Sequence, residues 1–243
     1  MEEYLYPHFY KIEKEHWWFV ARQYILLRYL DARAHLPASA RLLDVGCGTG
    51  AILELFSQKY DAYGLDFSPS AIEFCRQRGL QHLFAGSIES YPREKLFDII
   101  TMLDVVEHTD DDLGLLRAGR NLLADSGALL VTVPAFPSLW GHHDIVLHHR
   151  RRYTKAQLTH LLEAAGFQIA HITFFNAILF PAAVAKRMLA RLLRSGEAND
   201  LEIPRHGMNA VLRRVFELEG GILTRATLPF GLSLLCLAKK RGG

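Results

Sequence analysis

Cysteine is scarce in this chain of 243 residues. The three cysteines, Cys47, Cys75 and Cys236, are scattered and form no Cys-x-x-Cys pair, so neither a disulfide framework nor a zinc site is indicated. The N-terminal stretch is charged and aromatic and has no apolar segment of the kind found in secretory signals. No apolar run reaches the roughly 18 residues that a membrane-spanning helix needs. We therefore expect a soluble protein of the reducing cytoplasm.

The chain also has little net charge. The formal value is +2, which argues against capture of nucleic acid by the whole surface, so no nucleic-acid partner is expected. The charge is unevenly distributed, because residues 171–243 carry eleven Lys/Arg against five Asp/Glu while the remainder is net acidic. Hydrophobic residues make up 50% of the chain, enough for one large α/β core with a small appendage.

Residues 41–66 are the most informative stretch. The sequence RLLDV indicates a short buried strand, GCGTG a glycine turn, and AILELF a helix with apolar residues at helical spacing. A second apolar run ends at Asp66, about 20 residues after the turn, where an acidic side chain can accept the hydroxyls of a ribose. Strand, glycine turn and helix form the first half of a nucleotide-binding βαβ unit.

The spacing of the glycines restricts the class of ligand that the turn can bind. Dinucleotide sites use G-x-G-x-x-G with a pyrophosphate at the helix N-terminus, whereas Gly46, Gly48 and Gly50 follow G-x-G-x-G. Asp44 lies at the mouth of this turn, where a carboxylate would repel a pyrophosphate and attract an ammonium and a sulfonium. The sequence DVGCGTG followed by GLD resembles the class I S-adenosylmethionine-dependent methyltransferases. The resemblance implies S-adenosyl-L-methionine as the cofactor.

Repeated strand and helix patterns predict the fold. FDIITMLDVVEH and LLADSGALLVTVP resemble the fourth-strand and fifth-strand signatures of the same family. We predict an α/β, Rossmann-like, seven-stranded, mostly parallel sheet with helices on both faces. The resemblance adds the strand order 3-2-1-4-5-7-6 with the seventh strand antiparallel. The expected strands are 41–45, 63–66, 81–85, 96–103, 128–134, 167–174 and 232–238, with a turn at 125–127.

The resemblance also suggests which residues hold the cofactor. Phe67 directly follows the ribose acid, so its ring could stack on adenine or equally belong to the core. Ser87 stands where the family usually has an acidic residue for the adenine amino group, so a hydroxyl or the backbone must serve. The expected cofactor-binding residues are Asp44, Gly46, Cys47, Gly48, Gly50, Asp66, Phe67, Ser87, Ile88, Leu103, Trp18 and Arg22.

Two segments flank the predicted catalytic body. Residues 1–36 form a helical cap, and residues 37–243 form the methyltransferase domain with a helical insertion at about 176–227. EHWWFVAR resembles the N-terminal cap of many small-molecule methyltransferases, which would turn Trp18 or Phe19 toward the ligand and pair Arg22 with its carboxylate. Packing of the cap on the sheet edge is the plainer interpretation.

The insertion allows two roles. Its two apolar, basic stretches could be helices that cover the substrate pocket or form a homodimer. They could instead make a peripheral membrane contact, because basic amphipathic helices suit anionic headgroups. A lipid-linked or lipophilic acceptor would be consistent with both.

Histidines supply the candidate base. Methyl transfer to oxygen requires removal of a proton, and imidazole suits that role near neutral pH. His108 follows the fourth strand, and His143 lies in a His- and Arg-rich loop, 140–153, after the fifth. That loop could line the acceptor pocket, or Arg151 and Arg152 could anchor it through salt bridges.

No metal is expected, because neither His pair matches a known zinc motif. The alternative is Mg²⁺ held by Asp104, Glu107 and His108, since ubiquinone-biosynthesis O-methyltransferases carry an acid-x-x-Glu-His at that place.

The sequence thus predicts a methyltransferase that uses S-adenosyl-L-methionine on a small-molecule or lipid-linked acceptor, most readily at oxygen. Three alternatives remain open at this point: a Rossmann-type NAD-linked oxidoreductase, a nucleic-acid or protein methyltransferase, and a non-catalytic binding protein. The N/D-P-P-Y/F signature of amino methylation is missing after the fourth strand.

Overall fold

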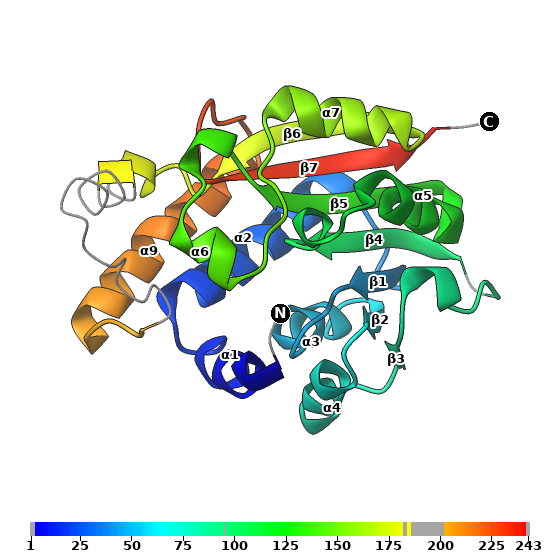
Figure 1. The fold of residues 1–243 in the computed structure, drawn as a ribbon, viewed down its shortest axis with the longest axis horizontal. Helices are drawn as coiled ribbons and strands as arrows, with labels where there is room; N and C mark the ends of the chain where they lie inside the picture. The colour runs from blue at the N-terminus through cyan, green and yellow to red at the C-terminus, as the bar shows by residue number, and fades with distance from the viewer. Residues whose placement is uncertain (1–2, 95, 182–183, 186–201, 242–243) are drawn as a thin grey trace.

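A single seven-stranded sheet organises the chain (Figure 1). The computed structural model describes residues 3–94, 96–181, 184–185 and 202–241. The sheet order is β3-β2-β1-β4-β5-β7-β6, with β7 antiparallel to both neighbours and the other pairings parallel, which confirms the predicted fold class and order. The strands are β1 (Arg41–Val45), β2 (Asp61–Asp66), β3 (Leu83–Ala85), β4 (Phe97–Leu103), β5 (Leu123–Pro134), β6 (Phe167–Phe175) and β7 (Ser233–Lys240).

The central strands are apolar on both faces because helices cover both. In β5, Leu129 and Val131 belong to one buried cluster, whereas Leu130, between them, belongs to another. The two-residue period of a strand sends neighbouring side chains to opposite sides. Such near-continuous apolar runs are typical of buried parallel sheets.

Helices from different parts of the chain form the two outer layers. Figure 1 shows α5 (Asp112–Leu122) and α7 (Lys155–Ala164) in front of the sheet, with α2 (Trp17–Ala34) and α9 (His206–Leu223) side by side behind it. The crossover helices α3 (Ala51–Ser57) and α4 (Pro69–Gln77) connect β1, β2 and β3. The long helices α2 and α9 contact each other extensively, although nearly 200 residues separate their first turns.

The N-terminal residues are helical, as predicted. A 3-10 turn (Glu3–Leu5), α1 (Tyr6–Ile12) and α2 precede the first strand. Nδ1 of His16 accepts the backbone N–H of Trp18 at 3.2 Å and so caps the start of α2. His35 takes a left-handed conformation with φ 51° and ends the helix just before Pro37. The division of the chain into a cap and a catalytic domain stays a prediction.

The insertion before β7 contributes α9. Phe216 is fully buried against α2, with Trp17 in edge-to-face contact at a ring-centroid distance of 5.9 Å. Oε2 of Glu219, also buried, accepts the backbone N–H groups of Ala177 and Ile178 at 2.9 and 3.2 Å. These bonds fasten α9 to the chain that leaves β6. The first predicted helix of the insertion lies largely outside the described residues.

The expected turn at 125–127 is wrong. These residues belong to β5, which begins at Leu123, and the pairing of β4 with β5 shifts register between Phe97 and Ile99. An Asp-Ser-Gly sequence favours a turn, but here the extra residues are accommodated as an irregularity in the strand. Over the described residues, no helix combines the length and apolarity that a membrane span requires.

Candidate active site

The carboxyl ends of the parallel strands define the candidate site. Ligands of open α/β sheets bind at this edge. Three non-glycine residues with positive φ lie there: Asp104 (59°) after β4, Phe136 (57°) after β5 and Asn176 (59°) after β6. Backbone strain of this kind concentrates at functional sites. Each of these strands therefore turns sharply at the same edge.

The glycine turn after β1 is shaped by close contacts on one side and open space on the other. Gly46, Gly48 and Gly50 have φ values of 72°, 56° and 85°. A Cβ on Gly46 would lie 2.5 Å from the side chain of Val105, and one on Gly50 would lie 2.8 Å from Sγ of Cys75. A Cβ on Gly48 would meet nothing within 4 Å. The backbone at Gly48 therefore borders a space that a ligand can fill.

Asp44 is the acidic group beneath this turn. Its side chain is buried, and Oδ1 accepts the hydroxyl of Thr101 at 2.5 Å. Oδ2 is buried too and has no hydrogen-bond partner in the described part of the chain. Burial raises the pKa of Asp44 to about 7, although Thr101 and the charge of Arg22 act in the opposite direction. A buried, unpartnered carboxylate oxygen is costly, and a cationic ligand would stabilise it.

Asp66 ends β2 as predicted and organises the adjacent loops. Its two oxygens accept the backbone N–H groups of Gly48 and Ser68, both at 2.9 Å. Burial raises its pKa, while these two bonds oppose that rise. Each carboxylate oxygen keeps a second lone pair for a ligand hydroxyl. Phe67, the next residue, is 70% exposed and belongs to no core cluster, so its ring is free to stack on a planar ligand.

The other predicted cofactor residues differ in exposure. Cys47 is buried, and its Sγ lies 3.8 Å from Sγ of Cys75. Ile88 is buried in the core, and Leu103 packs partly against the α2 layer. Ser87 is exposed, its hydroxyl 3.5 Å from that of Ser90. These assignments to the cofactor stay predictions.

Arg22 lies inside the site. Its Nη2 donates to Oδ2 of Asp104 at 2.6 Å and to Oγ1 of Thr132 at 3.3 Å. The guanidinium also lies 5.4 Å from the ring centroid of Trp18. The sequence predicted contact between Arg22 and a ligand carboxylate, and in this structure Asp104 holds that group at the strand edge. Phe19, the alternative ligand-facing aromatic, packs instead against Phe9 within the cap.

Two residues that sequence reasoning missed fasten the cap to the glycine turn. Glu13, between α1 and α2, accepts the hydroxyl of Thr49 in the turn and Nη2 of Arg78 at 3.1 Å. Arg78, buried at the end of α4, also donates Nε to the carbonyl of Thr49 at 2.6 Å and Nη2 to that of Tyr10 at 3.3 Å. No local pattern marks either residue, because the contact joins segments about 65 residues apart.

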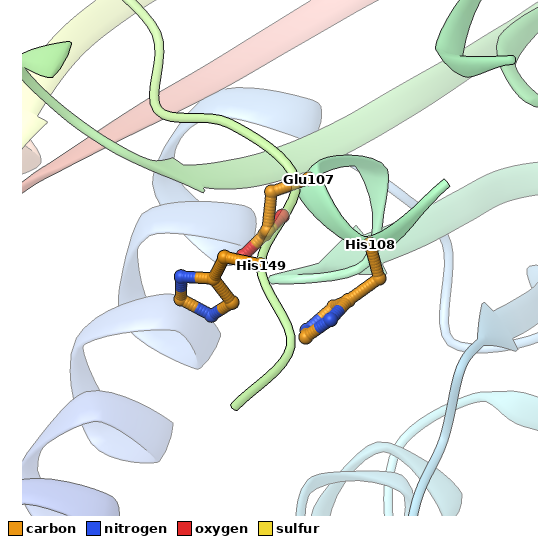
Figure 2. A group of neighbouring side chains, drawn as sticks. All are labelled: Glu107, His108 and His149. Atoms are coloured by element: carbon orange, nitrogen blue, oxygen red, sulfur yellow. The ribbon is translucent and has the colours of Figure 1, made fainter. Parts of the chain in front are cut away.

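A second group of side chains converges after β4 (Figure 2). Glu107 and His108 come from a 3-10 turn, Val106–His108, after β4, and His149 comes from the loop after α6 (His142–Val146). One ligand-type atom from each lies within 4.8 Å of the other two. Glu107 is fully buried, and neither of its oxygens has a hydrogen-bond partner among the residues placed by the structure.

The two imidazoles are held by further contacts. Nδ1 of His149 is 2.8 Å from Oδ1 of Asp144, and Nδ1 of His108 is 3.3 Å from the carbonyl of His148. Desolvation opposes ionisation of Asp144, but the bond from His149 and the charge of Arg152 outweigh it and hold its pKa at about 2. Burial lowers the pKa of His108 to about 4, and the proximity of His149 adds to this. The His108 ring is therefore neutral at physiological pH.

The loop arginines anchor rather than line the site. Arg152 is buried and donates Nε to Asp144 at 2.8 Å and Nη1 to the carbonyl of Ala135 at 3.0 Å. Arg151 pairs with Asp112 at 2.8 Å. Salt-bridge anchoring, one of the two predicted roles of these arginines, is thus what the structure shows. His143 lies nearby, its ring centroid 6.2 Å from that of His149.

Glu107, His108 and His149 have side chains of the types that can hold a divalent metal. The predicted alternative set of Asp104, Glu107 and His108 is not the one that converges, because Asp104 is engaged by Arg22 and Thr132. His149 takes its place, so Glu107, His108 and His149 form the candidate cluster. The structure therefore changes the membership of that set, and the expectation of no metal stays a prediction.

The residues at the glycine turn fit S-adenosylmethionine. Oδ2 of Asp44 has no hydrogen-bond partner among the residues that the structure describes, and a buried anionic oxygen of this kind suits a cationic ligand. The open side of Gly48 leaves room for the ligand, and Asp66 with the exposed ring of Phe67 offers acceptors and a stacking surface for a nucleoside. A pyrophosphate would instead lie against buried carboxylates, which disfavours a dinucleotide.

Comparisons with known proteins point to the methyltransferases. Residues 18–172 match the family described as "Methyltransferase domain". The chain is 29% identical over 170 residues to a ubiquinone biosynthesis O-methyltransferase from Xanthomonas axonopodis, covering 61% of this chain and 71% of that protein. It is 31% identical to one from Xanthomonas campestris, but the match spans only 48% of that relative's length and 44% of this chain.

A solved structure shows the same fold. The S-adenosylmethionine-dependent methyltransferase from Archaeoglobus fulgidus superposes with a TM-score of 0.59 at 23% identity, covering 96% of this chain and 99% of that one. The family match spans more than half of the chain and includes the glycine turn and the Glu107–His108 segment. This chain therefore belongs to the methyltransferase-domain family and is a class I S-adenosylmethionine-dependent methyltransferase.

Proposed function

We propose that this enzyme transfers a methyl group to an oxygen atom of a lipophilic small molecule or lipid-linked acceptor. The observation that carries the proposal is the buried carboxyl group of Glu107 next to the neutral imidazole of His108. Both oxygens of Glu107 are unpartnered in the described structure, and burial raises its pKa well above the usual range. A hydroxyl acceptor must lose its proton during transfer, and such a pair can receive it. A neutral amine acceptor, by contrast, already has a free lone pair and needs no base for the transfer step.

The cofactor side of the reaction is a matter of binding and orientation. S-adenosylmethionine supplies an electrophilic methyl group on a sulfonium. Asp44 would hold the cationic end of the cofactor, Asp66 its ribose and Phe67 its base. Arg22, which lies beside Asp104, would pair with the cofactor carboxylate. The cap, fastened through Glu13 and Arg78, covers the glycine turn and excludes water.

The acceptor side uses the pair after β4. The acceptor O–H donates its proton to His108, which becomes an imidazolium beside the carboxyl group of Glu107. Burial raises the pKa of that carboxyl well above its usual range, and the neighbouring imidazolium favours its ionised form. Asp144 orients His149, which limits the positions that His108 can take, since the two rings meet edge to face at a centroid distance of 4.9 Å. The ring centroid of His143, the second candidate base, lies 6.2 Å from that of His149.

Aromatic side chains at the same strand edge support a lipophilic acceptor. Phe136, after β5, stacks on Phe174 of β6 at a centroid distance of 5.2 Å and meets Phe180 at 5.9 Å. Phe180 in turn contacts Phe230, which is partly exposed. Aromatic side chains that reach solvent at the carboxyl ends of the strands can contact the ring or the apolar tail of an acceptor.

Metal binding is the second role that Glu107, His108 and His149 support. Asp144 bonded to Nδ1 of His149 is the outer contact that orients metal-bound histidines in many proteins. A bound divalent ion would polarise the acceptor hydroxyl. Turnover of protein treated with a chelator separates the two roles.

Matched acceptors test the proposal. Methyl transfer from labelled S-adenosylmethionine is compared for a phenol with a long alkyl tail, the aniline with the same tail, and the phenol without a tail. We expect efficient transfer to the tailed phenol alone. Preference for the aniline would contradict oxygen methylation, and equal rates with the untailed phenol would contradict a lipophilic acceptor.

A further inference from the structure

The outer surface of α2 and α9 is apolar and basic. The outer face of α9 exposes Val211, Leu218 and Ile222, with Leu218 67% exposed, while its inner face buries Phe216, Glu219 and Leu223. Spacings of seven and four residues place the three apolar side chains on one stripe. Met208, at the N-terminal end of the helix, is 56% exposed as well.

A shallow groove of about 400 Å³ crosses this surface between the two helices. Tyr24 and Arg28 line it from α2, and Arg214 and Leu218 line it from α9. Arg28 donates Nη1 to the hydroxyl of Tyr24 at 2.7 Å, and neither arginine pairs with a carboxylate in the part of the chain that the structure describes. Glu217, the acidic residue at the rim, already pairs with Arg213 at 2.7 Å.

We propose that this face, the α2–α9 outer face (Tyr24, Arg28, Val211, Arg214, Leu218 and Ile222), docks on an anionic lipid bilayer. Exposed aliphatic side chains alternate with arginines along one helix, as in helices that lie in the headgroup region. The arginines attract the negative surface potential, and the aliphatic side chains enter the acyl boundary. Exposed Arg205 and Arg225 extend the positive charge to the two ends of α9.

Charge complementarity selects the bilayer over other occupants. A two-fold dimer through this face would bring Arg28 and Arg214 of both copies together without acids to match them. A nucleic acid would meet aliphatic side chains where binding surfaces for single strands offer aromatic rings. A membrane satisfies both the cations and the apolar stripe.

The face also leads to the active site. Asn209, in the first turn of α9, accepts the backbone N–H of Trp17 and donates to the carbonyl of Glu15, each at 2.9 Å. The first turn of α9 therefore lies against the start of α2, five residues before Arg22. Docking through α9 would bring the site to the membrane surface, which the proposed lipophilic acceptor would exploit. The docking itself does not depend on the identity of that acceptor.

Sedimentation with vesicles tests the proposal. The full chain is mixed with phosphatidylcholine vesicles containing about 30 mol % phosphatidylglycerol, or with phosphatidylcholine alone. We expect binding to the anionic vesicles that is at least about tenfold tighter than to neutral ones and is weakened by salt. The double variant Arg28→Glu/Arg214→Glu should lose more than about tenfold in vesicle affinity, since one basic residue near the surface contributes about fivefold. Leu218→Asp should lose a similar amount.

The matched control is Arg76→Glu/Arg117→Glu, which reverses two exposed arginines on α4 and α5, away from this face. Binding of S-adenosylhomocysteine serves as the folding check for every variant. The proposal is overturned if the wild type ignores anionic vesicles at low salt, or if Arg28→Glu/Arg214→Glu binds them as the wild type does. It is equally overturned if the control double variant loses as much. A dimer in sedimentation velocity that Leu218→Asp dissociates would assign the face to self-association instead.

Discussion

Replacing Asp44 with asparagine should raise the free energy of unfolding of the free protein and lower its affinity for S-adenosylmethionine. The Asp44 carboxylate is 1% exposed, and burial raises its pKa from 3.8 to about 7. At about 1.4 kcal/mol per pKa unit, keeping the ionised form in the fold costs on the order of 4 kcal/mol. Asparagine keeps the acceptor for Thr101 but carries no charge to bury.

The pH dependence has a defined sign. The folded pKa of Asp44 lies above the unfolded one, so the folded state holds an additional proton between pH 3.8 and about 7. The destabilisation is absent below that window, grows as the pH rises through it, and is complete above it. Asp44→Asn should therefore raise the free energy of unfolding by up to about 4 kcal/mol at about pH 8 and by little near pH 4. Urea unfolding at the two pH values measures this difference.

Cofactor binding should show the opposite preference. Because the cationic cofactor requires ionised Asp44, wild-type affinity for S-adenosylmethionine should rise about tenfold per pH unit up to about pH 7 and then level off. Asp44→Asn should bind more weakly, without this slope. Thr101→Val, which removes the hydroxyl donor to Asp44, should move the midpoint to higher pH. Calorimetric titration across this range is the assay. A wild-type affinity independent of pH, or an asparagine variant with full affinity, would show that the cofactor does not require ionised Asp44.

Three further outcomes are expected. His108→Gln should lower kcat about 100-fold and leave the Kd for S-adenosylmethionine unchanged. The control His82→Gln, at an exposed position, should change neither quantity. A loss of cofactor affinity in His108→Gln would mean that His108 has a structural role. Treatment with a chelator should leave turnover intact if the trio acts through His108 as a base, and activity restored by Mg²⁺ after a loss would make Glu107, His108 and His149 metal ligands. Phe216→Ala should reduce the free energy of unfolding by about 3–5 kcal/mol through loosening of α9 against α2, measured by urea titration; no change would mean that this contact contributes little.

Much of the fold follows from local sequence patterns. The glycine turn, Asp66 and the apolar strand runs lie within a few dozen residues of one another, so period, spacing and turn chemistry suffice to place them. The family resemblance supplied the strand order, which local patterns do not contain. The sequence 125–127 misled because its turn propensity is accommodated as an irregularity within β5 and does not end the strand.

The candidate site was only partly accessible from the sequence. Asp44 and His108 stand next to recognisable strands, so their place at the ligand edge could be predicted. Two other features depend on tertiary packing between distant segments. One is the contact of Glu13 with Thr49 and Arg78, and the other is the convergence of His149 on Glu107. His149 was one of several histidines in its loop, and its bond to Asp144 and its position next to Glu107 and His108 become evident only in the structure.

A crystal structure of the protein with S-adenosylhomocysteine would show whether the cofactor binds between Asp44, Gly48 and Asp66. We expect the ligand's ammonium at Oδ2 of Asp44 and its adenosine between Asp66 and Phe67, alongside the open backbone of Gly48. A ligand bound elsewhere, or a glycine turn that accepts a pyrophosphate from NAD in its place, would contradict this expectation.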